Sequence, residues 1–194
     1  SDQLDVQSNL FAQAQIRFPG VVALREHFRC MPEIIEFSNQ LCYAPLNQPL
    51  TPLRQFGSDR LKPLRSVFVP HAHVTNRGSS DQTNELEAEA LIRQVEECIQ
   101  DPAYRDRSMG IISLLGTGQV KLLTKLLAER IAPAEIHKRR IRVGNPYAFQ
   151  GDERDVMFLS MVTAMEPGVT IRAETSADTK RRFNVAARCG SSTQ

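Results

Sequence analysis

The chain of 194 residues lacks the features of membrane and exported proteins. Its apolar runs all fall short of the ~18–20 residues that a membrane-spanning helix needs. The N-terminal stretch SDQLDVQSNL has neither the basic start nor the apolar centre of a signal peptide, and it begins without Met, as an excised or cleaved product would. We therefore expect a cytoplasmic protein with no membrane partner.

The sequence also lacks clustered cysteine and histidine. Four cysteines stand at positions 30, 42, 98 and 189, and none forms a CxxC pair. Reduced thiols are expected, rather than a zinc site or a disulfide framework. His71 and His73 would share one face of a strand, but no carboxylate or cysteine ligand is near them in sequence. Solvated or internally bonded histidines are favoured, and no metal site is predicted.

A strong charge of one sign is absent as well. The net charge is only +2, so bulk electrostatics gives no reason to expect nucleic-acid binding, and any such site must be a local patch. The hydrophobic content of 41% and the charged content of 24% are ordinary for a soluble globular protein. This length is enough for one domain with a good core.

Apolar, strand-like runs alternate with helical patterns. Strands are predicted at 21–24, 66–70, 109–115, 141–143 and 155–162, and helices from Pro32, from Asn84, from Gly116 and over 178–188. Asn84 followed by Glu87 is typical of a capping box. The proline-rich segment 44–65 reads as an irregular insertion. The pattern predicts a three-layer α/β/α fold with a mostly parallel sheet, whose ligands bind beyond the carboxyl ends of the strands.

Several segments then resemble one family, the superfamily 1 helicases, in the branch of the RNA-decay helicases and their bacterial relatives. LREHFRCMPEIIEFSNQLCY (24–43) resembles motif IV, and GIISLLGTGQVKLLTKLL (110–127) is similar to the strand, loop and helix after it. VGNPYAFQGDERDVMFLSMV (143–162) resembles motif V, with its Phe-Gln-Gly-x-Glu-x-Asp-Val centre, and RRFNVAAR (181–188) looks like the start of motif VI.

The resemblance implies the second RecA-like domain of a two-domain, ATP-driven helicase or translocase, a P-loop NTPase fold without its own P-loop. This domain would span 21–188, after a lead-in over 1–20 and before an atypical tail over 189–194. Its expected partners are the N-terminal RecA-like domain of the same parent protein and single-stranded DNA or RNA. ATP and Mg²⁺ are the expected cofactors, and both would need the missing first domain.

The resemblance also implies roles for individual residues. Arg29 would reach across the domain cleft to the γ-phosphate, where a planar, permanently charged guanidinium suits phosphate oxygens. Arg188 would be a second such arginine, and Glu153 would accept from a ribose hydroxyl or a nucleotide-bound water. Gln150 and Gly151 complete the expected ATP contacts, since glycine allows close approach and an amide both donates and accepts.

Nucleic acid is expected at Asn145 and at the start of the helix formed by Thr117, Gly118 and Gln119, where backbone N–H groups favour a phosphate. A plain helix cap is the alternative for this helix start. Two other groups of charged residues each allow two interpretations. Asp152, Arg154 and Asp155 could pair locally or form a solvated cluster, and the basic run HKRR (137–140) could contact phosphate or be a solvated turn.

The sequence departs from the family at several points. No GxxxxGK[ST] loop occurs, so nothing would cradle the phosphates or place Mg²⁺, and the isolated chain is predicted not to hydrolyse ATP. Asn145 stands where the family usually has threonine or serine. The motif VI match ends after Ala187, which suggests a truncated or misread tail. The alternative functions are a non-catalytic nucleic-acid-binding or interaction module and an unrelated parallel α/β domain.

Overall fold

The computed structural model describes residues 10–18, 20, 22, 25–27, 30–43, 49–53 and 61–164. Its helices and strands are α1 (Leu10–Arg17), β1 (Glu26–His27), α2 (Pro32–Ser38), β2 (Thr51–Pro52), α3 (Glu85–Gln100), β3 (Met109–Ser113), α4 (Thr117–Arg130), α5 (Pro133–Lys138), β4 (Arg142–Gly144) and β5 (Val156–Ser160). A π-helical turn, Asn39–Tyr43, continues α2, and short 3₁₀ helices cover Pro102–Tyr104 and Pro146–Phe149.

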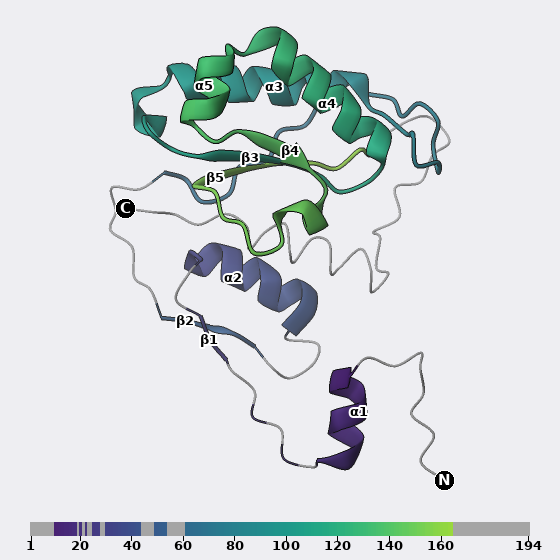
Figure 1. Ribbon diagram of the computed structural model, residues 1–194, viewed down its shortest axis with the longest axis vertical. Helices are drawn as coiled ribbons and strands as arrows, with labels where there is room; N and C mark the ends of the chain where they lie inside the picture. Colours follow the sequence, from purple (N-terminus) through teal and green to yellow (C-terminus); the bar gives the residue numbers. More distant parts are fainter. Residues whose placement is uncertain are drawn as a thin grey trace.

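Three parallel strands form the central sheet, in the order β4-β3-β5. Helices α3, α4 and α5 cover one of its faces, and α2 lies on the other side with the short parallel pair β1–β2 (Figure 1). The predicted α/β class with a parallel sheet is therefore confirmed. The segment 44–65, which reads as an irregular insertion, contains β2.

The central strand β3 is buried along its whole length, and its side chains alternate between the two faces. Met109 and Ile111 join the helices in the main core cluster. Ile112 packs on the opposite face with Phe149, which comes from the connection between β4 and β5. Each face of β3 thus has an apolar partner, which explains why this strand reads as a continuous apolar run.

Helix α3 begins as predicted, but its capping box is only half formed. The Asn84 side chain accepts a hydrogen bond from Glu87 N at 3.1 Å, as the first half of that motif requires. In the second half of the motif, the Glu87 carboxylate would accept from Asn84 N, but the Asn84 N–H instead donates a hydrogen bond to Gln119 Oε1 at 2.8 Å. The Glu87 carboxylate binds the chain after β5.

The structure differs from the sequence predictions at two places. The predicted strand over 66–70 does not form: Val67 is 54% and Phe68 70% exposed, and the structure pairs this segment with no strand among the described residues. Strand propensity without a partner ladder does not make a strand. Helix α5 was missed, although Pro133 at its first turn is a start signal. The predicted strand over 21–24 and helix over 178–188 lie wholly or mostly outside the described residues.

The start of α4 is packed tightly against the loop that precedes α3. The Ser80 carbonyl accepts hydrogen bonds from Thr117 N at 2.7 Å and from Gly118 N at 3.1 Å. A Cβ at Gly118 would lie only 2.6 Å from the Asp81 carbonyl oxygen. Glycine is therefore required here by close backbone approach.

We expect Gly118→Ala to destabilise the protein by about 1–3 kcal/mol, the usual cost of overpacking. The sign opposes helix propensity, which favours alanine over glycine. Urea denaturation followed by circular dichroism would measure the change. Gly20→Ala is the control, because a Cβ there meets nothing within 4 Å. A Gly118→Ala protein as stable as the wild type would contradict the packing argument.

Candidate functional site

The predicted phosphate contact at the start of α4 is already occupied from within the protein. Besides the two N–H groups bound to the Ser80 carbonyl, the Thr117 hydroxyl donates to the same oxygen at 3.0 Å. Gly118 is buried, and only Thr117 of the pair is exposed. The structure thus matches the alternative reading of a capped helix, with the cap supplied by the Ser80 carbonyl.

Gln119 is fully buried, so its side chain faces the interior and not a ligand. Its Nε2 donates to the Asn84 carbonyl at 3.2 Å and to Ser160 Oγ at 3.1 Å, while its Oε1 accepts from Asn84 N. The amide therefore joins the start of α3, the first turn of α4 and the end of β5. The Gln119 side chain has no exposed group that could make the predicted contact with nucleic acid.

The chain after β5 is bound by the start of α3. The Glu87 carboxylate accepts from Met161 N at 2.6 Å and from Val162 N at 2.9 Å, and Asn84 Nδ2 donates to the Thr163 carbonyl at 3.3 Å. Val162 has a φ of +56°, which is strained for a β-branched residue. Sequence reasoning gave Glu87 only a capping role, because nothing local marks a partner this far along the chain.

The stretch 145–151 presents polar groups on the surface. Asn145 is exposed, and its side chain accepts from Ala148 N at 2.9 Å, which caps the 3₁₀ helix Pro146–Phe149. Tyr147 is 58% exposed on that helix, and Gln150 follows it, also exposed. Gly151 has a φ of +80° and open space where a Cβ would stand. This glycine is required by its conformation, and its backbone is open to a ligand.

Asp152 is the centre of an arginine cluster. Its carboxylate binds Arg154 Nη1 in a short hydrogen bond, Arg142 Nη1 at 3.3 Å, and Arg140 Nη2 at 3.9 Å. The hydrogen bond from Arg154 lowers the pKa of Asp152 below its usual value. Asp152 and Arg154 therefore pair locally, which was one of the two alternatives that the sequence left open.

Asp155 also pairs within the protein. Its Oδ2 accepts from Ser108 N at 2.7 Å and from Ser108 Oγ at 2.6 Å, and its own N–H donates back to Ser108 Oγ at 3.1 Å. Ser108 directly precedes β3 and Asp155 directly precedes β5. This reciprocal pair therefore fixes the amino ends of the two neighbouring strands.

Glu153, the predicted ribose contact, lies half-buried between the two members of the Asp152–Arg154 pair. Its N–H donates to Asp152 Oδ1 at 3.0 Å, and its carbonyl accepts from Arg154 Nη1 at 2.8 Å. Both main-chain groups of Glu153 are thus held in place. The predicted arginines Arg29 and Arg188 lie outside the described residues.

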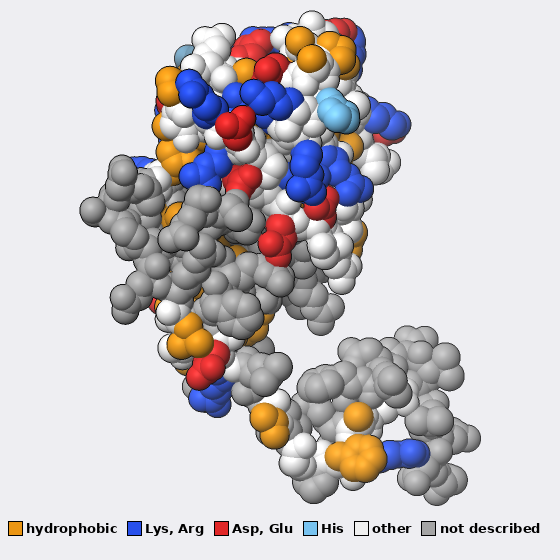
Figure 2. Space-filling model, turned by 60° about the vertical axis from the view of Figure 1, so that its left-hand side comes forward, with side chains coloured by type: hydrophobic (Ala, Val, Ile, Leu, Met, Phe, Trp, Pro, Cys, Tyr) orange, Lys and Arg blue, Asp and Glu red, His pale blue; other side chains and the backbone are white. Residues whose placement is uncertain are grey.

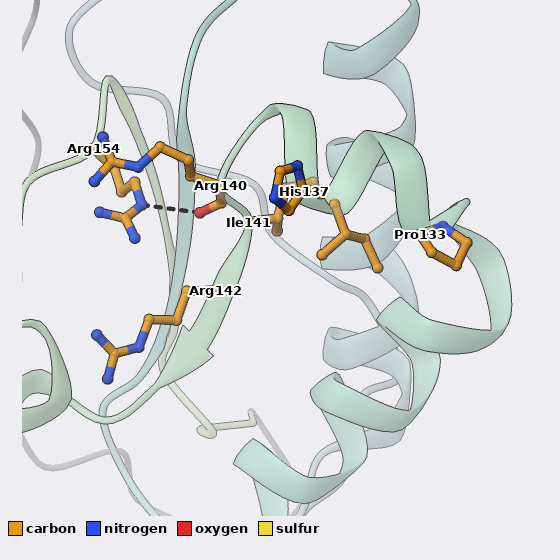
Figure 3. Close-up of a pocket in the computed structure, with 7 residues that line it drawn as sticks. Pro133, His137, Arg140, Ile141, Arg142 and Arg154 are labelled. Atoms are coloured by element: carbon orange, nitrogen blue, oxygen red, sulfur yellow. Dashed lines mark hydrogen bonds between the residues drawn. The ribbon is translucent and has the colours of Figure 1, made fainter.

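A shallow pocket of about 560 Å³ lies where α5 meets β4 (Figure 3). Its basic lining residues are His137, Arg140, Arg142 and Arg154, and the three guanidinium groups extend to the same side of β4. Arg142 is the first residue of β4, and Arg154 stands two residues before β5. The pocket is therefore at the amino ends of the strands, away from the edge where ligands of such sheets usually bind.

The turn that carries Arg140 is a Schellman motif. Arg140 N donates to the His137 carbonyl at 3.1 Å, and Ile141 N donates to the Ile136 carbonyl at 2.9 Å. Arg140 occupies the left-handed position of this motif, with a φ of +50°, where glycine is the usual residue. A side chain there costs roughly 1–2 kcal/mol. No sequence pattern indicated this conformation.

Two further observations concern membranes and metals. Among the described residues, no helix is both long and apolar enough to cross a bilayer. The same part of the chain contains no group of three or more His, Cys, Asp or Glu side chains that could hold a metal ion.

The parallel sheet and its helices define a RecA-like α/β domain. A family model described as AAA domain matches residues 6–189, and the chain therefore belongs to that family. This makes it a helicase-like, NTPase-related domain of the P-loop superfamily, a module of the nucleic-acid helicase type. No curated protein matches the chain.

The Glu87 carboxylate gives a prediction for the pH dependence of stability. Burial raises the pKa of Glu87 above its ordinary value of 4.5, although its hydrogen bonds from Met161 and Val162 act the other way. The folded protein thus holds this proton more tightly than the unfolded chain. The resulting stabilisation is present below pH 4.5 and is lost as the pH rises through the raised pKa.

We therefore expect Glu87→Gln to remove the loss of stability that the wild type shows as the pH rises, because the amide does not titrate. From pH 4.5 to 7, the free energy of unfolding of the wild type should fall relative to that of the variant. Urea denaturation at each pH would measure both curves. Glu85→Gln, an exposed position on the same helix, is the control and should parallel the wild type. Parallel curves for Glu87→Gln would contradict the assignment.

Proposed function

We propose that this chain is the second motor domain of an ATP-dependent nucleic-acid helicase or translocase. The observation that carries the proposal is the arrangement of residues 150–153 within a helicase-like domain of the AAA domain family. Gln150 and Gly151 are exposed, and Glu153 is fixed directly after them by two main-chain hydrogen bonds. A carboxylate on a fixed main chain, beside an open glycine, suits recognition of a nucleotide.

The neighbouring charges support this role by being engaged with each other. Asp152 and Arg154 neutralise one another, so they hold the loop in shape without competing for a ligand. Gln150 offers both donors and an acceptor from the surface. The Glu153 carboxylate would accept from a ribose hydroxyl. The fixed main chain of Glu153 lowers the ordering cost of binding.

ATP and Mg²⁺ would be bound mainly by a first RecA-like domain of the same parent protein. Arg29 would enter the cleft between the domains and stabilise the charge on the transferring phosphate, with Arg188 as a second arginine. Closure of the two domains around ATP would then be coupled through the 145–153 stretch to movement along a single strand. Rigid-body closure around a ligand is a common switching mode.

The single strand, DNA or RNA, would bind at the carboxyl edge of the sheet. Asn145 has an exposed polar side chain there and is the proposed contact, whereas the N–H and hydroxyl of Thr117 are already donated to the Ser80 carbonyl. Asn145 already uses its side-chain oxygen to cap the 3₁₀ helix, which leaves the amide nitrogen as the group to donate to a phosphate. Buried Gln119 would hold this edge in place and make no contact itself.

The proposal predicts a large effect of Arg29→Ala on ATP hydrolysis by the parent protein that contains both domains. Removing an arginine finger should lower the nucleic-acid-stimulated kcat by about 10³-fold or more. A coupled ATPase assay with and without a single-stranded oligonucleotide would measure it. The isolated chain should show no hydrolysis, because its sequence has no GxxxxGK[ST] loop.

Arg25→Ala is the matched control, because Arg25 is an exposed arginine four positions earlier and should leave kcat unchanged. If Arg29→Ala hydrolysed ATP at the wild-type rate, Arg29 would not be the finger. If the two-domain protein bound single strands without hydrolysing ATP, the motor proposal would fail. That result would favour a non-catalytic nucleic-acid-binding module.

A further inference from the structure

The pocket between α5 and β4 concentrates positive charge on the surface. Three guanidinium groups, from Arg140, Arg142 and Arg154, face one carboxylate, that of Asp152. Lys and Arg side chains also gather, with interspersed acids, on the upper body of the molecule that holds the three-stranded sheet (Figure 2). The pocket itself therefore carries an excess of positive charge.

The two outer arginines of the pocket are available to a ligand. The Arg140 side chain is 65% exposed, and its guanidinium is 3.9 Å from Asp152, which is beyond hydrogen-bond distance. Arg142 is 49% exposed and gives Asp152 one hydrogen bond of 3.3 Å. A guanidinium has five N–H donors, so both side chains keep donors for phosphate oxygens.

Arg154 holds this arrangement from inside. Its side chain is buried, it forms the short bond to Asp152, and its Nε donates to the Arg140 carbonyl at 3.0 Å (Figure 3). It therefore pairs with the Asp152 carboxylate and at the same time fixes the turn that presents Arg140. The outer guanidinium groups stand on a rigid support.

The backbone at Arg140 supplies an independent argument. The left-handed position of the Schellman motif favours glycine, yet the chain carries an exposed arginine there. Residues kept in strained conformations concentrate at functional sites. Stability alone therefore does not explain why this residue is an arginine.

From these observations we infer that Arg140 and Arg142 form a second binding site for the backbone phosphates of a nucleic-acid strand. This site lies at the amino ends of the strands, apart from the strand contact proposed at the carboxyl edge. The inference rests on the proposed function in one respect, namely that nucleic acid is the polyanion present. The 3.9 Å and 3.3 Å ion pairs with Asp152 would be exchanged for phosphate contacts.

The test is binding of a fluorescein-labelled, unstructured single strand to the full chain, measured by anisotropy at several salt concentrations. Arg140→Gly should weaken binding by about three- to tenfold at low salt and reduce the slope of log K against log [salt] by about one. Its melting temperature should equal or exceed that of the wild type, because glycine relieves the left-handed strain. Arg142→Gln should weaken binding in the same way.

Two control variants separate charge from backbone effects. Asn76→Gly replaces another residue of positive φ, 53°, without changing charge, and should leave binding unchanged. Arg93→Gln removes an exposed arginine of α3 and should also bind as the wild type does. A loss of affinity in Arg93→Gln as large as that in Arg140→Gly would show a diffuse charge effect, and a similar loss in Asn76→Gly would show a backbone effect; either result would overturn the proposal.

Other results would overturn it too. If the Arg140→Gly variant bound the strand like the wild type, or melted at a lower temperature, Arg140 would have a structural role only. Competition of the bound strand by inorganic pyrophosphate at equimolar concentration would identify a small-anion site instead. The motor proposal fails separately, through the ATPase of Arg29→Ala, and that assay does not depend on Arg140.

Discussion

The buried amide of Gln119 is the contact on which the arrangement of the domain depends. One side chain satisfies both main-chain groups of Asn84 and reaches Ser160 at the end of β5. Buried polar groups need partners, so losing the amide would leave several of them unsatisfied in the interior. The start of α3, the first turn of α4 and the end of β5 are therefore set as one unit, from which the surface loops project.

Periodicity in the sequence was enough to predict this unit but not its polar contacts. The strands β3, β4 and β5 and the helices α3 and α4 each follow from a local apolar pattern. The failure at 66–70 has the complementary cause, since that segment has the pattern but no neighbouring strand to pair with among the described residues. Gln119 was predicted to contact nucleic acid because it stands at the start of a helix. Its partner in the structure, Asn84, lies 35 positions away, and no local pattern shows such a pairing.

For the candidate site, the resemblance predicts a position after β4, and Gln150 and Gly151 are exposed there. Their contacts with ATP stay predictions. The pairing of Asp152 with Arg154 could not be chosen from sequence, because charge spacing does not say which groups meet. The left-handed Arg140 was out of reach for a different reason, since a residue type other than glycine or asparagine gives no sign of a positive φ.

The connection between β4 and β5, residues 145–155, runs from the carboxyl ends of the parallel strands to their amino ends. It leaves the carboxyl end of β4 at Asn145, passes beneath the sheet at Phe149, and reaches the amino end of β5 at Asp155. At the β5 end of this connection, Asp155 is bound to Ser108. At the β4 end, the Asn145 side chain caps the 3₁₀ helix. A ligand that shifted this connection at one end would therefore also act on its other end. By thermodynamic linkage, ligands at the two edges would then change each other's affinity by the same factor.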